Sequence, residues 1–499
     1  MLILTTFKRA VLAVLAGLVS YFAYPSPNFW PAIFISVAGL YISVRGLNFW
    51  KATGIGLLGG LAFYVAQIYW ISQYLGPEPL IALAGLEAII YALFAGCIGL
   101  VSSREVRPWT LSLAVATLWA GREWFATHFP YGGFPWSRVA MSQADSPLAF
   151  WVSVGGFGLL SFLIVAFTVY SIEAFKHGIR VALRPVAIVL IGLFAIPAGL
   201  ANLPSTTSGH LRIVGIQGNA NAGLFANEVR GTIRDNHLEA TYDFLKTGKK
   251  FDLVVWPENA SDLNPDDDEA TRQILTDLVN NSLGKPLIFG TITSSGDRMF
   301  NSSKLWLPNR GEVDQYDKKR PVPFGEYVPN RDFFYQLAPD LVGMISRGYD
   351  FGTRDGIFNV SGKKLGILIC FEEAIDELPR DLVTQGASLI IAQTNNADFG
   401  HSDESVQQLA IARLRAIETG RAIVNISTVG PSAIIDSHGT LLDSSPAYKA
   451  DYVIANVPES NQMTIAMRGG WLFDPAIAVL AGILIVGLFV DNRRKTTKL

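Results

Sequence analysis

Long apolar runs dominate the chain up to about residue 205 and occur once more near its end. A helix needs about 20 consecutive apolar residues to cross a bilayer. The pattern therefore predicts an α-helical membrane bundle of about eight transmembrane helices. The predicted spans lie near 8–24, 30–46, 53–76, 80–102, 109–127, 148–173, 184–203 and 472–490.

The hydrophobic pattern changes between about residues 210 and 460, where short apolar runs alternate with polar segments of helical spacing. This alternation is typical of an α/β domain in water. We therefore predict a bundle of about seven spans over 1–205, an inserted α/β domain over 206–465, and a last span with a basic tail over 466–499.

Composition supports a membrane protein and excludes several other classes. Only 16% of the 499 residues are charged, against about a quarter in soluble proteins, and the mean hydropathy is +0.31. A net charge of −2 offers no basic surface for nucleic acid. Two cysteines, Cys97 and Cys370, cannot form a disulfide framework, and without a CxxC or HExxH motif the sequence predicts no metal and no cofactor.

Basic residues gather in alternate loops of the predicted bundle, which fixes its orientation. If both termini are cytoplasmic, these groups share the cytoplasmic side and the α/β domain lies outside; Arg138, in a longer outer loop, is an exception. The first segment also fits a signal peptide, but we favour a retained helix because no small-residue cleavage site follows it. The basic groups are Lys8, Arg9, Arg45, Lys51, Arg104, Arg107, Lys176, Arg180, Arg184 and the tail from Arg493.

One predicted span carries charge. Arg122 and Glu123 lie near the end of the fifth apolar run, where a charge costs a few kcal/mol unless it is paired or interfacial. The pair is either an interfacial ion pair or part of a functional site, and the sequence leaves both interpretations open.

Three motifs in the α/β domain carry the candidate chemistry. Glu258 follows a strand in "FDLVVWPENA", Lys318 and Glu326 lie in "YDKKRPVPFGEYVP", and Cys370 ends the apolar run of "LGILICFEE". Singly, these residues fit a helix start, a solvated charge and a core residue. Together they supply a base, a cation for a tetrahedral oxyanion, and a nucleophile that is only a few per cent ionised at pH 7.

The three motifs resemble the Glu-Lys-Cys motifs of the nitrilase, or carbon–nitrogen hydrolase, superfamily. Their combination with a multi-span bundle resembles the apolipoprotein N-acyltransferase family over nearly the whole chain. The resemblance implies that Glu258 is the general base, Lys318 stabilises the oxyanion and Cys370 is the nucleophile. It also implies that Glu326, Phe371 and Glu372 support the site.

The same resemblance implies the fold and the reaction. The fold is a nitrilase-like α-β-β-α sandwich. Cys370 takes an acyl chain from a phospholipid, expected to be phosphatidylethanolamine, as a thioester. The acceptor is the N-terminal amine of a diacylglyceryl-cysteine on an apolipoprotein. The resemblance places the enzyme, which we expect to be a monomer, in the bacterial cytoplasmic membrane with its catalytic domain on the periplasmic side.

An aromatic and aliphatic segment, 331–351, follows the lysine motif. It is either an ordinary buried loop or a lid that dips into the membrane and admits acyl chains. In the second interpretation its lipid contacts are Phe333, Phe334, Leu341, Met344 and Ile345.

The sequence departs from the family pattern at Asp398, where relatives usually have an aromatic residue, and it offers Lys319 as a second candidate beside Lys318. Three other functions compete with acyl transfer. A membrane-anchored amidase would use water as the acceptor, although one helix would suffice to anchor it. A cysteine hydrolase would pair Cys370 with His401 or His438, and a transporter or sensor would carry a degenerate outer domain.

Overall fold

The computed structural model describes residues 4–203, 207–223, 226–227, 229–345 and 348–496. Contacts divide the chain into two compact units. The helical unit contains the described residues of Met1–Ser72, Gly76–Leu203 and Thr464–Leu499, and the α/β unit those of Gln73–Leu75 and Pro204–Met463. The first predicted domain boundary, at 205/206, lies outside the described residues.

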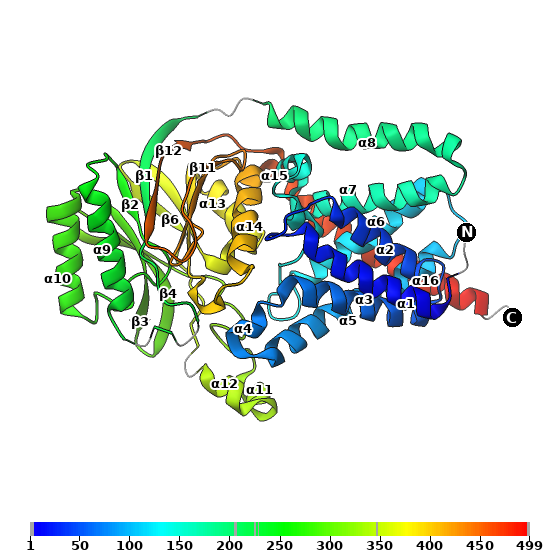
Figure 1. The fold of residues 1–499 in the computed structure, drawn as a ribbon, viewed down its shortest axis with the longest axis horizontal. Helices are drawn as coiled ribbons and strands as arrows, with labels where there is room; N and C mark the ends of the chain where they lie inside the picture. Colours follow the sequence, from blue (N-terminus) through cyan, green and yellow to red (C-terminus); the bar gives the residue numbers. More distant parts are fainter. Residues whose placement is uncertain (1–3, 204–206, 224–225, 228, 346–347, 497–499) are drawn as a thin grey trace. The chain divides into compact units, whose positions relative to one another are not determined.

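The described residues of the helical unit form helices joined by turns and loops, without a strand (Figure 1). The longer ones are α1 (Thr6–Val19), α2 (Ala32–Val44), α3 (Phe49–Ile68), α5 (Pro77–Ser102), α6 (Pro108–Ala126), α7 (Val152–Phe175), α8 (Ile179–Ala201) and α16 (Phe473–Thr496). The shorter ones are η1 (Ser20–Ala23), η2 (Val139–Gln143), η3 (Pro147–Trp151), α15 (Ile465–Arg468) and η7 (Gly470–Leu472). Helix α4 (Ile71–Leu75) is divided, because its residues Gln73–Leu75 belong to the α/β unit.

The long helices coincide with the apolar runs of the sequence. Among the described residues, six helical segments are long and apolar enough to cross a membrane. Of the other two predicted spans, α2 is apolar but has only 13 residues, and α6 carries Arg122 and Glu123. The predicted membrane bundle is thus confirmed, and the number of spans stays approximate.

Small residues let the helices of this unit pack closely. A Cβ on Gly17 of α1 would lie 2.6 Å from the carbonyl oxygen of Gly59 in α3. A Cβ on Gly99 of α5 would lie 2.5 Å from the Cβ of Ala52 in α3. Close backbone approach is the usual source of helix association where water supplies no driving force.

The charges of the fifth predicted span are buried and paired. Arg122 and Glu123 are 2% and 3% exposed, and their side chains form an ion pair of 3.3 Å. Glu123 also accepts hydrogen bonds from the Trp119 indole and the Val139 amide, both at 3.1 Å. Arg138, the exception to the charge pattern of the loops, is itself buried, with its guanidinium 4.6 Å from the Phe157 ring centroid.

The α/β unit is built on two six-stranded sheets. The first has the order β12 (Asp451–Glu459), β1 (Gly209–Gln217), β2 (Leu253–Val255), β3 (Leu287–Ser295), β4 (Arg298–Leu307), β5 (Gly311–Asp317). The second has the order β11 (Leu441–Ser444), β10 (Ala433–Ile435), β9 (Ile423–Ser427), β8 (Leu389–Thr394), β7 (Lys363–Ile369), β6 (Ile357–Val360).

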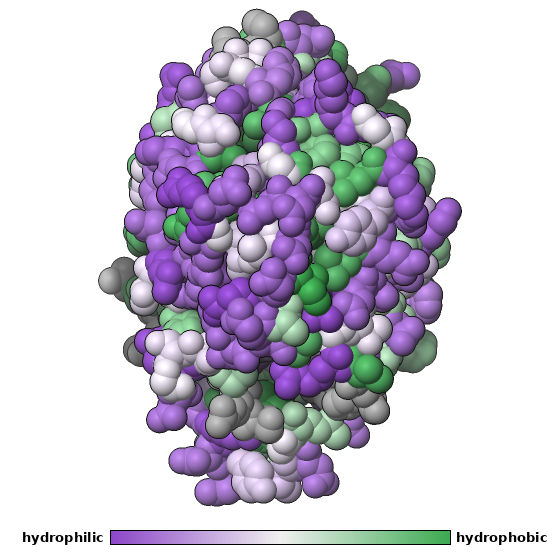
Figure 2. All heavy atoms as spheres, turned by 90° about the vertical axis from the view of Figure 1, so that its left-hand side faces the viewer, coloured by the Kyte–Doolittle hydropathy of each residue, from purple (hydrophilic) through white to green (hydrophobic). Residues whose placement is uncertain are grey.

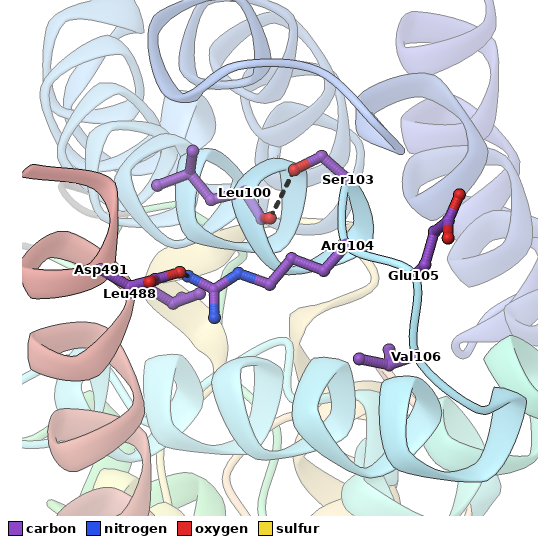
Figure 3. A pocket seen from close by; sticks show the side chains of 7 residues that line it. All are labelled: Leu100, Ser103, Arg104, Glu105, Val106, Leu488 and Asp491. Atoms are coloured by element: carbon purple, nitrogen blue, oxygen red, sulfur yellow. Dashed lines mark hydrogen bonds and ion pairs between the residues drawn. The ribbon is translucent and has the colours of Figure 1, made fainter. Parts of the chain in front are cut away.

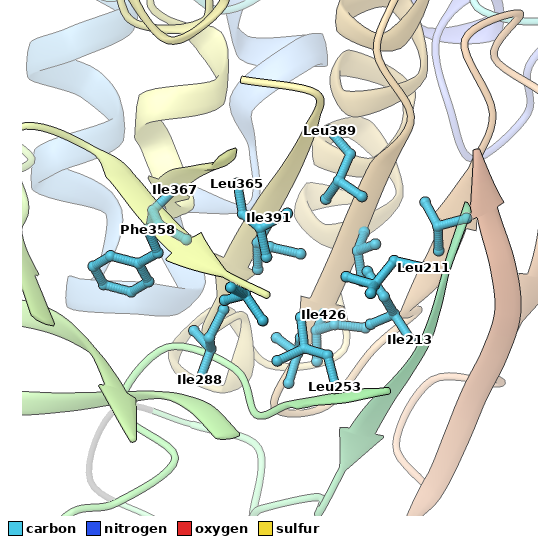
Figure 4. Packing of buried hydrophobic residues seen from close by; sticks show 14 of the residues in the cluster. Leu211, Ile213, Leu253, Ile288, Phe358, Leu365, Ile367, Leu389, Ile391 and Ile426 are labelled. Atoms are coloured by element: carbon cyan, nitrogen blue, oxygen red, sulfur yellow. The ribbon is translucent and has the colours of Figure 1, made fainter. Parts of the chain in front are cut away.

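The sheets pack face to face through aliphatic side chains from both (Figure 4). Helices cover their outer faces: Phe244 and Leu275 join the core outside the first sheet, and α13 and α14 pack on the second. This layering confirms the predicted α-β-β-α sandwich. The helices of the unit are α9 (Thr232–Lys246), α10 (Glu269–Asp277), η4 (Leu278–Leu283), α11 (Arg331–Leu337), α12 (Pro339–Met344), η5 (Cys370–Ala374), α13 (Glu377–Thr384), η6 (Ala397–Phe399) and α14 (Glu404–Thr419).

Alternation explains why these segments form strands. In β1 exposed and buried residues alternate from His210 to Ile213 before the rest of the strand is fully buried. Strand β7 is apolar and buried after its first two lysines, and every residue of β8 is buried. Continuous burial is expected of parallel strands covered on both faces, and β7 pairs in parallel with β8. Figure 2 shows that hydrophilic side chains cover most of the face on the side of α9 and α10, as expected for a domain in water.

Candidate active site

The three predicted catalytic residues each follow the end of a strand in the α/β unit. Glu258 comes three residues after β2, Lys318 directly after β5, and Cys370 directly after β7. Cys370 has a φ of 54°. This left-handed conformation is strained in a non-glycine residue and marks a sharp strand-to-helix turn, a geometry that presents a nucleophile at a sheet edge.

Lys318 joins two carboxylates in the interior of the unit. Its ammonium nitrogen Nζ lies 3.3 Å from Oε1 of Glu258 and 2.9 Å from a carboxylate oxygen of Glu326. The side chains of Lys318 and Glu258 are 1% and 4% exposed. Both carboxylate oxygens of Glu326 lie at 2.9 Å, so three carboxylate oxygens surround an ammonium that has three donors.

Asn301 of β4 is a member of the site that the sequence did not predict. Its side-chain amide donates to Oε1 of Glu258 at 2.7 Å and to Oε1 of Glu326 at 2.9 Å. One amide nitrogen therefore fixes the spacing of both carboxylates around Lys318. Glu326 is held further by the Val322 amide, which donates to Oε2 at 2.7 Å.

Glu372 connects the cysteine turn to the lysine loop. Its carboxylate accepts hydrogen bonds from the Ile369 amide at 2.9 Å and the Lys319 amide at 2.7 Å. The Tyr316 hydroxyl donates to the same carboxylate at 2.9 Å. Glu372 is fully buried, so these bonds fix the backbone just before Cys370 and just after Lys318. Phe371 is buried beside it.

The electrostatics of the site favour a protonated thiol at rest. Burial raises the pKa of Cys370 well above its ordinary value, and the charge of Glu258 raises it further. Burial also raises the pKa of Glu258, although Lys318 opposes this shift. Burial alone would lower the pKa of Lys318, but Glu258 and Glu326 outweigh it and hold that pKa well above its ordinary value.

It follows that attack by Cys370 requires removal of its proton during the reaction. Glu258 is the carboxylate whose charge acts most strongly on the thiol, which makes it the candidate base. The ammonium of Lys318 stays charged and is available to a developing oxyanion.

The two lysines that the sequence offers for the cation differ in their surroundings. Lys318 is buried against both glutamates, whereas Lys319 is half-buried and contributes its backbone amide to Glu372. Of the two histidines considered from the sequence, His401 packs its ring on Tyr448, and His438 lies between β10 and β11.

The segment after the lysine motif forms α11 and α12 rather than a buried loop. Phe333 and Met344 are 58% and 53% exposed. Phe334 packs edge-to-face between Phe324 and Phe333, with centroid distances of 4.8 and 5.1 Å. Leu341 and Ile345 are half-buried. The five predicted lipid contacts are therefore not part of a closed core; residues 346 and 347 of the segment lie outside the described residues.

A pocket of the helical unit carries none of the predicted catalytic residues (Figure 3). Arg104 crosses it toward Asp491 of α16, with an ion-pair distance of 3.0 Å, while Glu105 points away. The lining residues are Leu100, Ser103, Arg104, Glu105, Val106, Leu488 and Asp491.

Comparison with known proteins identifies the family. Residues 16–170 match the apolipoprotein N-acyltransferase N-terminal domain, and residues 233–464 match the carbon-nitrogen hydrolase family. The chain is 31% identical to apolipoprotein N-acyltransferase of Mycolicibacterium smegmatis, over 95% of its own length and 84% of that protein. The chain belongs to the apolipoprotein N-acyltransferase family.

Other members of the apolipoprotein N-acyltransferase family align over a similar span. The protein of that name from Allorhizobium ampelinum is 29% identical over 92% of this chain and 93% of its own length. Among solved structures, an amidase from Nesterenkonia sp. is 15% identical, covers 53% of this chain and 94% of its own, and gives a TM-score of 0.39.

Proposed function

We propose that the protein transfers an acyl chain from a phospholipid to the N-terminal amine of a diacylglyceryl-cysteine on an apolipoprotein. Family membership supports the transferase activity, and the pairing of Glu258 with Lys318 near Cys370 is the observation that carries the residue assignment. The enzyme acts in the bacterial cytoplasmic membrane.

In the first half-reaction Cys370 attacks the ester carbonyl of the phospholipid. Glu258 takes the thiol proton as the carbon–sulfur bond forms, and the ammonium of Lys318 stabilises the tetrahedral oxyanion. Each such donor commonly lowers the barrier by about 3 kcal/mol. The carbon–oxygen bond then breaks, and the proton on Glu258 passes to the departing oxygen, which leaves a lysophospholipid and a Cys370 thioester.

In the second half-reaction the acceptor amine attacks the thioester carbonyl. An amide bond forms, the carbon–sulfur bond breaks, and a proton from nitrogen returns to the Cys370 sulfur through Glu258. Asn301 and Glu326 hold the base and the cation in place throughout, and Glu372 fixes the turns that carry Lys318 and Cys370.

The exposed apolar side chains of α11 and α12 act as the lid that admits acyl chains. Phe333, Phe334, Leu341, Met344 and Ile345 are the lipid contacts in this proposal. Phosphatidylethanolamine is the donor, the catalytic domain lies on the periplasmic side with both termini in the cytoplasm, and the enzyme works as a monomer. The domain division at 205/206 and 465/466 separates the membrane part from the catalytic part.

Whether the acyl chain passes to the peptide amine or to water distinguishes this function from that of an amidase. Purified enzyme is incubated with phosphatidylethanolamine and a diacylglyceryl-cysteine peptide, and the products are separated by mass spectrometry. Acylated peptide without matching release of free fatty acid is expected. Release of fatty acid at the same rate with and without the peptide would favour water as the acceptor.

A further inference from the structure

Asp398 lies on the same edge of the second sheet as the nucleophile. Strands β7 and β8 run in parallel, with Ile369 opposite Gln393. Cys370 follows β7 directly, and Asp398 follows β8 by four residues, in the short helix η6. Neighbouring parallel strands end at the same edge, so both residues belong to the rim of one site.

The short helix is anchored on both sides of Asp398. The Gly223 amide donates to the carbonyl oxygen of Ala397 at 2.8 Å. The Tyr448 hydroxyl donates to the carbonyl oxygen of Gly400, and the Phe399 ring packs on Tyr74 at 5.3 Å between centroids. The backbone that carries Asp398 is therefore tied to three separate segments of the α/β unit.

The Asp398 carboxylate has no cation of its own. Within the described ranges, no hydrogen bond or ion pair reaches it, and its side chain keeps partial exposure. Burial raises its pKa to about 7, and the charges of Glu258 and Glu326 add to this shift. The ammonium of Lys318 is already engaged by those two glutamates.

The charges of Glu258 and Glu326 thus act on a third carboxylate, Asp398, while the buried ammonium of Lys318 pairs with the first two only. Such an arrangement repels anions and favours a second cation at the exposed carboxylate. In the proposed reaction one reacting group fits: the primary amine of the acceptor, which is largely an ammonium in water near neutral pH because its pKa is about 8. The ethanolamine headgroup of the donor carries the same chemical group.

We propose that Asp398 binds a primary ammonium group of a substrate at the rim of the active site, and that this group is the N-terminal ammonium of the acceptor. The inference rests on the proposed function. In this step the ammonium gives one proton to the Asp398 carboxylate, and the neutral amine attacks the Cys370 thioester. The second proton passes from nitrogen through Glu258 to the Cys370 sulfur as the carbon–sulfur bond breaks, so an amide, a thiol and a carboxylic acid result.

Separate measurement of the two half-reactions tests the assignment in the purified full-length protein. Thioester formation is followed by intact mass with phosphatidylethanolamine or with phosphatidylglycerol, which has no amine. Transfer is followed with a diacylglyceryl-cysteine peptide at varied concentration. The variants are Asp398→Asn, Asp398→Glu, and Asp297→Asn, which removes an exposed charge from the β3–β4 turn.

Asp398→Asn is expected to raise the peptide KM about tenfold and to leave thioester formation from both lipids within about twofold. Asp398→Glu should recover much of the loss, and Asp297→Asn should match the wild type. Slower thioester formation from phosphatidylethanolamine alone would still support an ammonium site but would assign it to the donor headgroup.

Two results would overturn the assignment. One is an unchanged peptide KM together with unchanged acylation by either lipid. The other is an equal loss in every reaction, phosphatidylglycerol included, which would indicate a general structural role. If the wild-type enzyme formed no thioester at all, the proposed function would fail before the role of Asp398 was tested.

Discussion

Removal of the Asn301 amide should disable the base without removing a catalytic group. Asn301→Ala deletes two hydrogen bonds, of 2.7 and 2.9 Å, that end on Glu258 and Glu326. Both acceptors are buried or nearly so, and neither carboxylate has a replacement donor on β4. Glu258 would then keep its contact with the ammonium of Lys318, and Glu326 would keep that ammonium and the Val322 amide.

The size of the effect follows from the charge of the acceptors. A hydrogen bond to a charged group contributes about 1.5–3 kcal/mol net. If the bond to Glu258 is the one that matters for catalysis, the loss corresponds to a rate reduction of about 10- to 150-fold. The bond to Glu326 adds to this loss through the position of Lys318.

The direction of the pH effect is also fixed. The Asn301 amide lowers the pKa of Glu258 by donating to its ionised form. Without it the pKa of Glu258 rises, so the base is protonated over a wider range and the acid limb of the rate profile moves to higher pH. The loss should therefore be larger at about pH 6 than at about pH 9.

The assay is single-turnover thioester formation with phosphatidylethanolamine in detergent micelles across this pH range. Ser303→Ala is the matched control, because Ser303 lies two residues along the same strand and is fully buried, and its hydroxyl has no hydrogen-bond partner among the described residues. A wild-type rate for Asn301→Ala, or an equal loss at every pH, would refute the reasoning.

Three further predictions concern the groups around Glu258 and Lys318. Lys318→Ala should reduce thioester formation at least about a hundredfold, while Lys319→Ala, whose backbone amide is retained, should change it little; the reverse order would move the oxyanion role one residue along. Glu326→Gln removes a charge that raises the pKa of Glu258, so the acid limb of its rate profile should move to lower pH, opposite to Asn301→Ala. Glu372→Gln places an amide group against backbone N–H donors and should lower the free energy of unfolding by about 2–3 kcal/mol in a denaturant titration, whereas an unchanged midpoint would contradict its anchoring role.

Much of the architecture could be predicted from periodicity. Apolar runs of bilayer length located the long helices, and short apolar runs ending in polar motifs located β2 and β7. Strand β5, with the sequence GEVDQYD, has no such run. The ends of helices were harder to predict from the sequence. The apolar run near 30–46 proved to be a helix of 13 residues, because Pro31 and the turn at Gly46 limit its length. The burial of the Arg122–Glu123 ion pair could not be predicted, because it depends on contacts with a neighbouring helix and loop that hydropathy does not show.

The candidate site also contains some residues that the sequence predicts and others that it does not. Glu258, Lys318 and Cys370 were predictable because each follows a strand with unusual chemistry for its position. Asn301 was not, because an asparagine within a strand has no distinguishing pattern and its role depends on strand β4 passing between two other motifs. The backbone contacts of Glu372 and the unpaired state of Asp398 likewise arise only when separate strand ends meet at one edge.

The acyl-enzyme itself provides the most direct test of the central claim. The purified protein is incubated with phosphatidylethanolamine, and its intact mass is recorded before and after treatment with hydroxylamine, which cleaves thioesters. We predict a fatty-acyl mass increment on the wild-type protein that hydroxylamine removes and that Cys370→Ala never acquires. An active preparation without this increment, or with an increment that persists in Cys370→Ala, would contradict the assignment of Cys370 as the nucleophile.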